Sequence, residues 1–267
     1  MRGEWALLAG LCRQAEAVLL SSVEERAWFE LALPGQLDPD TTGVLDGSLP
    51  KADWFVGSPS PRLSASDGQV HTVVLGRPLG LDPEFLSALA ARGVHVHCHG
   101  LRDGPGLDGR WQAWLARARA AAPGHLHLHP SVDQRQWLEI LSRYDAGWLH
   151  RFRSQNEGDL LRCTWDDLNQ PARLGTLMAA GLPVLQQRSA GSKVAMDRLV
   201  ERDRIGLLYA DADDLSAQLT DRALLSGVRR SVWSARARFT FDHHTPTLIA
   251  LFDRLAGGET GRRDNWS

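Results

Sequence analysis

The chain has 267 residues, of which 43% are hydrophobic and 23% are charged, and its formal net charge is −2. These values are those of an ordinary globular protein with one large or two small domains. No basic excess is present to neutralise a phosphate backbone, so we expect no nucleic-acid partner. The three cysteines are scattered and form no CxxC pair, which favours a cytoplasmic location, with peripheral attachment to a membrane left open. We also expect no transmembrane segment, because no run approaches about 20 apolar residues.

Residues 1–69 are predicted to form a small α/β unit followed by a connector. A helix, a strand and a second helix are expected over residues 5–17, 17–20 and 24–33. Ser22 and Glu25 have the spacing of a capping box, which marks the start of the second helix. Residues 34–69 are rich in Pro, Gly, Ser and Asp, with one short apolar run near Val44. We interpret them as a connector between two units.

From residue 70 onwards, short apolar runs alternate with helical segments. We expect strands at residues 70–75, 94–99, 125–129, 146–150, 183–187 and 205–209. We expect helices at residues 82–92, 111–121, 133–142, 172–180, 193–201 and 213–224. Strands separated by helices predict an α/β fold, with a doubly wound parallel Rossmann-like sheet of about six strands. This unit spans residues 70–256 and ends in helices, and residues 257–267 are predicted to be a disordered tail.

Several loops at the predicted carboxyl ends of the strands suit a ligand, because doubly wound sheets bind ligands at that edge. Gly76 and Arg77 follow the first strand, where glycine allows close approach and arginine can fork onto a diphosphate. Gly191 and Ser192 follow the fifth strand and precede a helix, which favours an anion. A solvated turn and a helix cap are the plain structural alternatives for these two pairs. His150 ends the fourth strand and is expected to face the same cleft, with a packing role as the alternative.

The segment from Asn169 to Leu185 is the most informative part of the chain. Asn169 stands where the cap of a helix is needed, and Pro171 suits the first helical position. Gly181 is the expected left-handed stop before the next strand. The first turn of a helix carries free N–H groups and a partial positive charge, and here it also carries Arg173. This combination predicts a binding site for the phosphates of a nucleotide.

The same segment carries a family resemblance. Its pattern Pro-x-Arg-Leu-x-x-x-Met-Ala-Ala-Gly-Leu-Pro-Val over residues 171–184 resembles the donor-binding helix of GT-B glycosyltransferases of the nucleotide-sugar-dependent, retaining type. The Ala-Gly-x-Pro part matches well. Arg173 stands where the family usually has Lys, and Thr176 stands where it has the Glu that holds the donor's ribose. Leu168 occupies the place of a second acidic residue, and Glu157 or Asp166 in the long polar loop 151–170 is a candidate substitute.

The resemblance implies a C-terminal donor-binding domain behind a truncated N-terminal acceptor domain. It implies a retaining hexosyltransferase of polysaccharide biosynthesis, which transfers a sugar from a nucleotide sugar to a glycan or lipid acceptor. The expected reaction is metal-independent and needs no cofactor beside the donor, although Asp-x-Asp triplets occur at residues 38–40 and 211–213. A partner chain that supplies the acceptor domain is a further expectation. The donor-binding candidates are Gly76, Arg77, Asn169, Arg173, Thr176, Gly191 and Ser192, and His150 is the candidate catalytic residue.

Two alternatives to a transferase stay open. The missing acidic residues favour a non-catalytic module that binds a nucleotide or a sugar, or a partner subunit of a true transferase. A different doubly wound protein, such as a dehydrogenase, is disfavoured because the turn after the first predicted strand, residues 76–80, is not a GxGxxG fingerprint. The pattern itself occurs at residues 104–109, after the second predicted strand.

Two runs of alternating histidines occupy the second and third predicted strands. Period-two spacing places His95, His97 and His99 on one face of the sheet, and the same holds for the histidines of residues 125–129. Zinc is one interpretation, but no carboxylate or thiolate completes a site, so we expect no metal. The interior histidines are expected to be core residues with hydrogen-bond partners. His99 and His129, at the strand ends, are positioned to face the ligand cleft.

Overall fold

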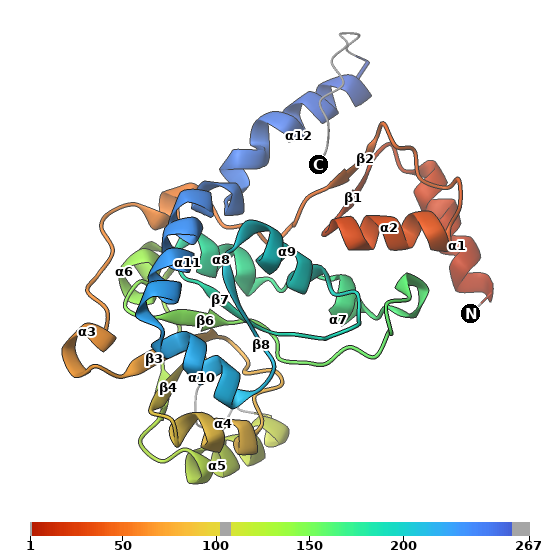
Figure 1. Cartoon of the computed structure of the whole chain (residues 1–267). Coiled ribbons are helices and arrows are strands. Elements are labelled where there is room, and N and C mark those ends of the chain that lie inside the picture. Colours follow the sequence, from red (N-terminus) through yellow and green to blue (C-terminus); the bar gives the residue numbers. More distant parts are fainter. Residues whose placement is uncertain (1, 102–107, 258–267) are drawn as a thin grey trace.

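The computed structural model describes residues 2–101 and 108–257 of the chain (Figure 1). Its centre is a six-stranded sheet, and a smaller two-stranded sheet lies near the N-terminus. Among the described residues, no helix is both long enough and apolar enough to cross a bilayer.

The large sheet is fully parallel and has the strand order β5-β4-β3-β6-β7-β8. The strands are β3 Val70–Leu75, β4 Val94–His99, β5 Leu126–His129, β6 Ala146–Trp148, β7 Val184–Gln187 and β8 Gly206–Tyr209. Strands β4 and β5 are added in turn on one side of β3. The chain then crosses back, and β6, β7 and β8 are added in turn on the other side. This topology confirms the predicted doubly wound Rossmann-like fold, and it places the switch point between β3 and β6.

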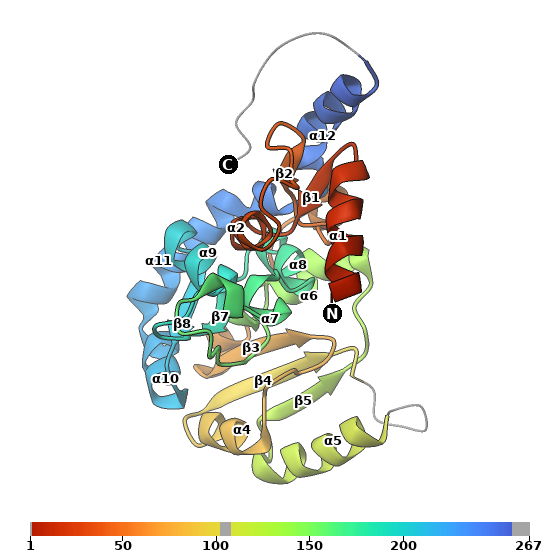
Figure 2. The same ribbon diagram turned by 90° about the vertical axis from the view of Figure 1, so that its right-hand side faces the viewer.

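Helices cover both faces of this sheet, as a parallel sheet requires. The larger ones are α4 Pro83–Ala90, α5 Gly109–Ala121, α8 Arg173–Ala179, α9 Ala195–Asp203, α10 Ala212–Thr220 and α11 Arg222–Ala235, with the shorter α6 at Trp137–Leu141. The last helix, α12 Phe241–Leu255, extends away from the sheet (Figure 1). Figure 2 shows α4 and α5 on one side of β3, β4 and β5, with α6 and α8 on the other side. The N-caps of α4 and α10 are Asp82 and Asp211, whose carboxylates accept from first-turn backbone N–H groups.

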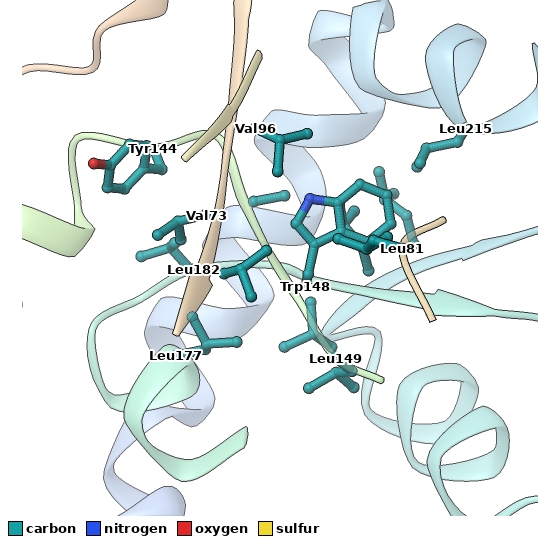
Figure 3. Packing of buried hydrophobic residues seen from close by; sticks show 14 of the residues in the cluster. Val73, Leu81, Val96, Tyr144, Trp148, Leu149, Leu177, Leu182 and Leu215 are labelled. Carbon is teal, nitrogen blue, oxygen red and sulfur yellow. The ribbon is translucent and has the colours of Figure 1, made fainter. Parts of the chain in front are cut away.

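The core is built from the apolar faces of these layers. Trp148 of β6 is fully buried, and its indole Nε1 donates to the Thr72 hydroxyl at 2.8 Å, so the polar atom of this large side chain is satisfied. Figure 3 shows Leu81 beside the indole of Trp148, and Val73, Leu177 and Leu182 grouped to the left of it. Leu177 of α8 packs so closely over β6 that a Cβ added to Gly147 would lie 2.5 Å from it.

The first part of the chain forms the predicted small α/β unit, with one element more than expected. It contains α1 Arg2–Gln14, β1 Val18–Leu20, α2 Val23–Ala32 and β2 Thr42–Val44, and β1 pairs with β2 in parallel. The expectation that residues 34–69 are only a connector was therefore wrong. Besides β2, these residues contain the short helices η1 Ala52–Phe55 and α3 Ser64–Asp67. A three-residue strand gives almost no periodic signal, and its pairing with β1 is non-local.

Three other predicted segments are divided differently in the structure. The helix expected at 133–142 is a 3-10 turn, η2 Gln134–Gln136, followed by α6. The helix expected at 213–224 stops at Thr220, because Asp221 caps a new helix by accepting from the N–H groups of Ala223 and Leu224. The loop expected at 151–170 contains η3 Leu160–Arg162 and α7 Trp165–Leu168. The C-terminal helices are confirmed as α11, η4 Arg236–Phe239 and α12, and the predicted tail falls, except for Gly257, outside the described residues.

Candidate functional site

The candidate site lies at the switch point, where the loops after β3 and β6 leave the sheet side by side. The loop after β3 contains two glycines with left-handed backbones, Gly76 at φ 75° and Gly80 at φ 78°. A Cβ on Gly76 would meet no atom within 4 Å, so the loop is open above this residue. A Cβ on Gly80 would overlap the carbonyl oxygen of Arg151, so only glycine fits there.

Arg151, which sequence reasoning missed, joins the two loops. Its backbone N–H donates to the carbonyl of Leu79 at 3.1 Å, and its Nη1 donates to the carbonyl of Gly80 at 3.0 Å. Nη1 also lies 2.6 Å from a carboxylate oxygen of Asp82, and the guanidinium lies 4.1 Å from the ring centroid of Phe85. The second glycine of the Gly-Arg-Pro-Leu-Gly turn was the available signal for this contact, but its partner is 71 residues away.

Three of the predicted site residues come together at this point. Nη2 of Arg173, at the start of α8, donates to the carbonyl of Arg77 at 2.7 Å. Nη1 of Arg173 is buried and has no hydrogen-bond partner among the described residues. The charges of both arginines act on His150, which lies two residues beyond the end of β6. The site therefore combines an exposed arginine, a largely buried arginine with an unused donor, and an imidazole.

Burial and charge set the protonation states of this cluster. Burial lowers the pKa of the Arg173 guanidinium to about 10, so Arg173 still carries its charge at neutral pH. Burial also lowers the pKa of His150 to about 4, and the positive charge of Arg173 acts in the same direction. Asp166 opposes this effect on His150. His150 is thus a neutral ring at neutral pH, able to donate one hydrogen bond and accept another.

The start of α8 differs from the prediction. Asn169 is the C-cap residue of α7, and Ala172 is the N-cap of α8 and provides no side-chain hydrogen bond. Asn169 does not cap α8 because the short helix α7 ends at that residue, a helix that the sequence did not reveal. Thr176 lies buried in the middle of α8, 7% exposed. The end of α8 is as predicted, because Gly181 is left-handed and the N–H groups of Gly181 and Leu182 bond back to Met178 and Leu177.

The turn with Gly191 and Ser192 belongs to a second cluster at the same edge of the sheet. The Ser192 hydroxyl donates to the carbonyl of Ser154 at 3.3 Å, and Gly191 is exposed and left-handed. Asn156, 2% exposed, holds the turn by accepting from the N–H of Lys193 at 2.9 Å and donating to its carbonyl at 2.8 Å. These contacts tie the loop after β7 to the loop after β6.

The two acidic candidates in the loop after β6 are placed differently. Glu157 forms an exposed ion pair with Arg162, which lowers the pKa of the Glu157 carboxyl. Asp166 is the one whose charge acts on His150. Leu168, at the position of the family's second acidic residue, is buried at 5% exposure.

The alternating histidines lie on one face of the sheet and are hydrogen-bonded, as predicted for the interior ones. His97 and His99 are buried, and the rings of the edge strand β5 are half-buried. Within residues 2–101 and 108–257, no three His, Cys, Asp or Glu side chains are arranged to hold a metal ion. His99 turns toward Tyr144, whose hydroxyl lies 2.7 Å from its Nε2, and none of its recorded contacts is with the arginine cluster.

A large cavity of about 910 Å³ lies elsewhere, between the N-terminal unit and the helices α9 and α12. Its walls include Glu24, Asp46, Arg198 and Arg238, and none of the three clustered site residues lines it. The charge cluster at the switch point, and not this cavity, is therefore the better candidate site.

Comparison with known proteins identifies the fold. No protein-family model and no curated protein matches the sequence. Among solved structures, sucrose-phosphate synthase from Thermosynechococcus elongatus superposes with a TM-score of 0.64 at 14% identity, over 97% of this chain and 63% of that one. Anabaena HepE in complex with UDP superposes with a TM-score of 0.65 at 13% identity, over 95% of this chain and 68% of that one. The chain thus spans less than two thirds of the sucrose-phosphate synthase it matches. With its doubly wound six-stranded sheet and these neighbours, the chain has a GT-B glycosyltransferase fold.

Proposed function

We propose that the chain binds a nucleotide sugar and transfers its sugar to a glycan or lipid acceptor, with retention of configuration. The observation that carries the proposal is the guanidinium of Arg173, which is largely buried beside the switch point with its Nη1 unpartnered. A buried donor without a partner is costly, and an anionic ligand would satisfy it. The Anabaena HepE structures contain UDP or UDP-glucose, which supports UDP as the first nucleotide to test.

The two arginines would act on the leaving group. As the bond between sugar and diphosphate breaks, negative charge accumulates on the diphosphate, and cations in a poorly solvated site stabilise that charge. Arg77 and Arg173 supply two positive charges there, so the proposed reaction needs neither a metal nor a cofactor beside the donor. His150, neutral at neutral pH, would contact the phosphate or the sugar as the candidate catalytic residue.

The remaining donor contacts are part of the same proposal. Gly76 leaves room for a ligand to approach the backbone, and Gly191 with Ser192 forms a second turn at the same edge of the sheet. Asn169 and Thr176 are proposed to contact the nucleoside. The setting we propose is the cytoplasm, or the cytoplasmic surface of a membrane, in polysaccharide biosynthesis. A partner chain that supplies an acceptor domain also belongs to the proposal.

A second function is favoured by a specific observation. Leu168 and Thr176 occupy the two positions where a carboxylate would grip the donor, and both side chains are buried. A site that keeps its phosphate-binding arginines but lacks these carboxylates fits a non-catalytic nucleotide- or sugar-binding module, or a partner subunit of a transferase.

Calorimetric titration with UDP and UDP-glucose tests the binding step. Arg173→Ala should weaken UDP binding by about 1.5–3 kcal/mol, the range for a hydrogen bond to a charged group. Arg222→Ala, which changes an exposed arginine at the start of α11, is the matched control and should bind as the wild type does. Equal UDP affinity in the wild type and in both variants would contradict the proposed contact of Arg173 with the phosphates.

A second assay separates the two functions. Release of UDP from UDP-glucose, measured with and without added acceptor, reports turnover of the donor. Release that disappears in Arg173→Ala supports the transferase. Tight UDP binding without any release supports the binding module.

A further inference from the structure

Seven histidines of β3, β4, β5 and the turn before β5 form a continuous array on one face of the large sheet. The array consists of His71, His95, His97, His99, His125, His127 and His129. Residues paired in register stack their rings, with centroids 4.6 Å apart for His71 and His95, 4.3 Å for His97 and His127 and 4.6 Å for His99 and His129. Diagonal neighbours are hydrogen-bonded instead.

The diagonal bonds form two parallel chains, each with an oxygen acceptor at one end. In the first chain, Nε2 of His71 lies 2.9 Å from a carboxylate oxygen of Asp67, Nδ1 of His71 lies 2.9 Å from Nε2 of His97, and Nδ1 of His97 lies 2.9 Å from Nε2 of His129. In the second chain, Nε2 of His95 lies 2.6 Å from the side-chain oxygen of Gln69. Nδ1 of His95 lies 2.9 Å from Nε2 of His127.

The end groups assign the protons along each chain. An ionised carboxylate and an amide oxygen only accept, so His71 and His95 must donate from Nε2. While the rings are neutral, Nδ1 of His71 and Nδ1 of His95 are then acceptors. The ring that follows in each chain, His97 or His127, must therefore donate from its Nε2. His99 has the opposite tautomer, because the carbonyl of Pro130 accepts from its Nδ1 and the hydroxyl of Tyr144 donates to its Nε2.

The first chain has room for one additional proton and no more. A proton from water enters at Nδ1 of His129, the Nε2 proton of His129 passes to Nδ1 of His97, and the Nε2 proton of His97 passes to Nδ1 of His71. Both bonds between imidazoles are reversed but kept, the bond from Nε2 of His71 to Asp67 keeps its direction, and the added positive charge lies on the ring beside that carboxylate. A second proton would leave two N–H groups facing each other between neighbouring rings, so that one hydrogen bond would be lost. The second chain ends on the neutral Gln69, so a proton there has no carboxylate to balance it and would sit on His95, stacked on His71.

We propose that this array is a proton-sensitive lock that holds the β4–β5 edge and the Gly76–Arg77 loop while its rings are neutral and releases them in mildly acidic solution. The link to the loop is direct, because the backbone N–H of Gly76 donates to the carbonyl of His99 at 2.8 Å. The titratable and charged groups that face the array are Asp67 from α3, Arg143 and Tyr144 from the loop before β6, and Asp145, which accepts from the backbone N–H of His71.

The burial of the rings supports this behaviour. Burial lowers the pKa of His95 and of His99 to about 4, and it also lowers the pKa values of His127 and His129. Neighbouring histidines act in the same direction on His95 and His99, and Arg143 does so on His129. The folded array therefore resists protonation, whereas an opened array accepts it freely.

Hydrogen exchange measured by mass spectrometry on the full chain at pH 7.5 and pH 5.5 tests the lock without any nucleotide, so its result is independent of the proposed function. After correction for intrinsic rates, amides of β4, β5 and loop 76–80 should exchange about tenfold faster at the lower pH. Amides of β7 and β8 should speed up by a clearly smaller factor, set by the pH dependence of global unfolding. Equal protection at both pH values, or equal loosening of both halves of the sheet, would refute the proposal.

The variant for this test is the double substitution His127→Gln and His129→Gln. Glutamine keeps an N–H donor close to the position of Nε2 but cannot be protonated, so the acid-induced loosening should shrink at least severalfold. His243→Gln on α12, outside the array, is the matched control and should keep the wild-type profile. An unchanged profile in the double variant overturns the proposal. If the double variant does not fold, ¹⁵N imidazole spectra of the wild type decide, because the lock requires neutral Nε2–H rings at pH 7.5 in His71, His95 and His97.

Discussion

One row of register-paired residues crosses the large sheet and shows how different its two halves are. From β7 through β6 to β3 the row contains Val184, Gly147 and Val73, and from β4 to β5 it continues as His97 and His127. Along this row, the first half is apolar and is covered by Leu177 of α8, while the second half consists of imidazoles. The apolar half is stabilised by the packing of apolar side chains, which does not depend on pH. The imidazole half is held by hydrogen bonds between titratable rings, so its stability depends on the proton concentration.

The candidate site lies on the boundary between these halves. The loop after β3 leaves the strand that carries both Val73 and His71, and the loop after β6 leaves the apolar half. Arg151 and Arg173 reach from the second loop region to the first. Changes in either half should therefore be visible at the site, but only changes in one of them should depend on pH.

The largest expected effect is that of pH on the imidazole half. Unfolded histidines take up protons below about pH 6.5, whereas burial holds the pKa of His95 and of His99 at about 4 in the folded chain. Between these values the unfolded chain binds more protons, roughly two to four, so the free energy of unfolding falls as the pH falls from about 6.5 to 4. Urea unfolding at pH 7.0, 6.0 and 5.0 measures this slope. A constant free energy over that range would show that the array does not govern stability.

Leu177→Ala is the corresponding change in the apolar half. Leu177 is fully buried against Gly147, and its truncation should lower the free energy of unfolding by about 3–4 kcal/mol. Because no titratable group is involved, the loss should be the same at pH 7.0 and pH 5.5 in urea unfolding. A loss that changes with pH would mean that the two halves are not separate in their energetics.

Gly80→Ala changes the boundary itself. The new methyl group would overlap the carbonyl oxygen of Arg151 at a left-handed backbone position, so we expect a loss of about 3 kcal/mol in the free energy of unfolding. Gly76→Ala is the control, because that backbone is also left-handed but its Cβ meets no atom within 4 Å. It should cost only about 1–2 kcal/mol. Equal losses in the two variants would assign the whole effect to backbone strain and none to the contact with Arg151.

Tyr144→Phe is expected to have the smallest effect. Burial raises the pKa of Tyr144 to about 12, so its hydroxyl stays protonated and donates to Nε2 of His99. Its removal leaves a buried acceptor without a partner and should cost about 1–2 kcal/mol at pH 7.5. The deficit should be the same at pH 7.5 and pH 5.5, because His99, with its pKa lowered to about 4, stays neutral over that range. A deficit that grows on acidification would contradict the assigned tautomer of His99.

Much of the fold was predictable because its signals are local. All six strands of the large sheet follow from short apolar runs between helical segments, and the cluster of Arg77, His150 and Arg173 follows from the rule that strand ends meet at one edge. The features that were missed are non-local or very short. The strand β2 has three residues, the contact of Gly80 with Arg151 joins distant segments, and the diagonal pairing of the histidines depends on the register of three strands.

The unused Nη1 of Arg173 has one more consequence. The guanidinium is already anchored through Nη2 to the carbonyl of Arg77, so an arriving anion can take Nη1 without displacing an internal partner. Association then adds a hydrogen bond and replaces none, although the atoms that cover the buried Nη1 must move aside. The rate at which small dianions associate with this arginine should fall as ionic strength rises.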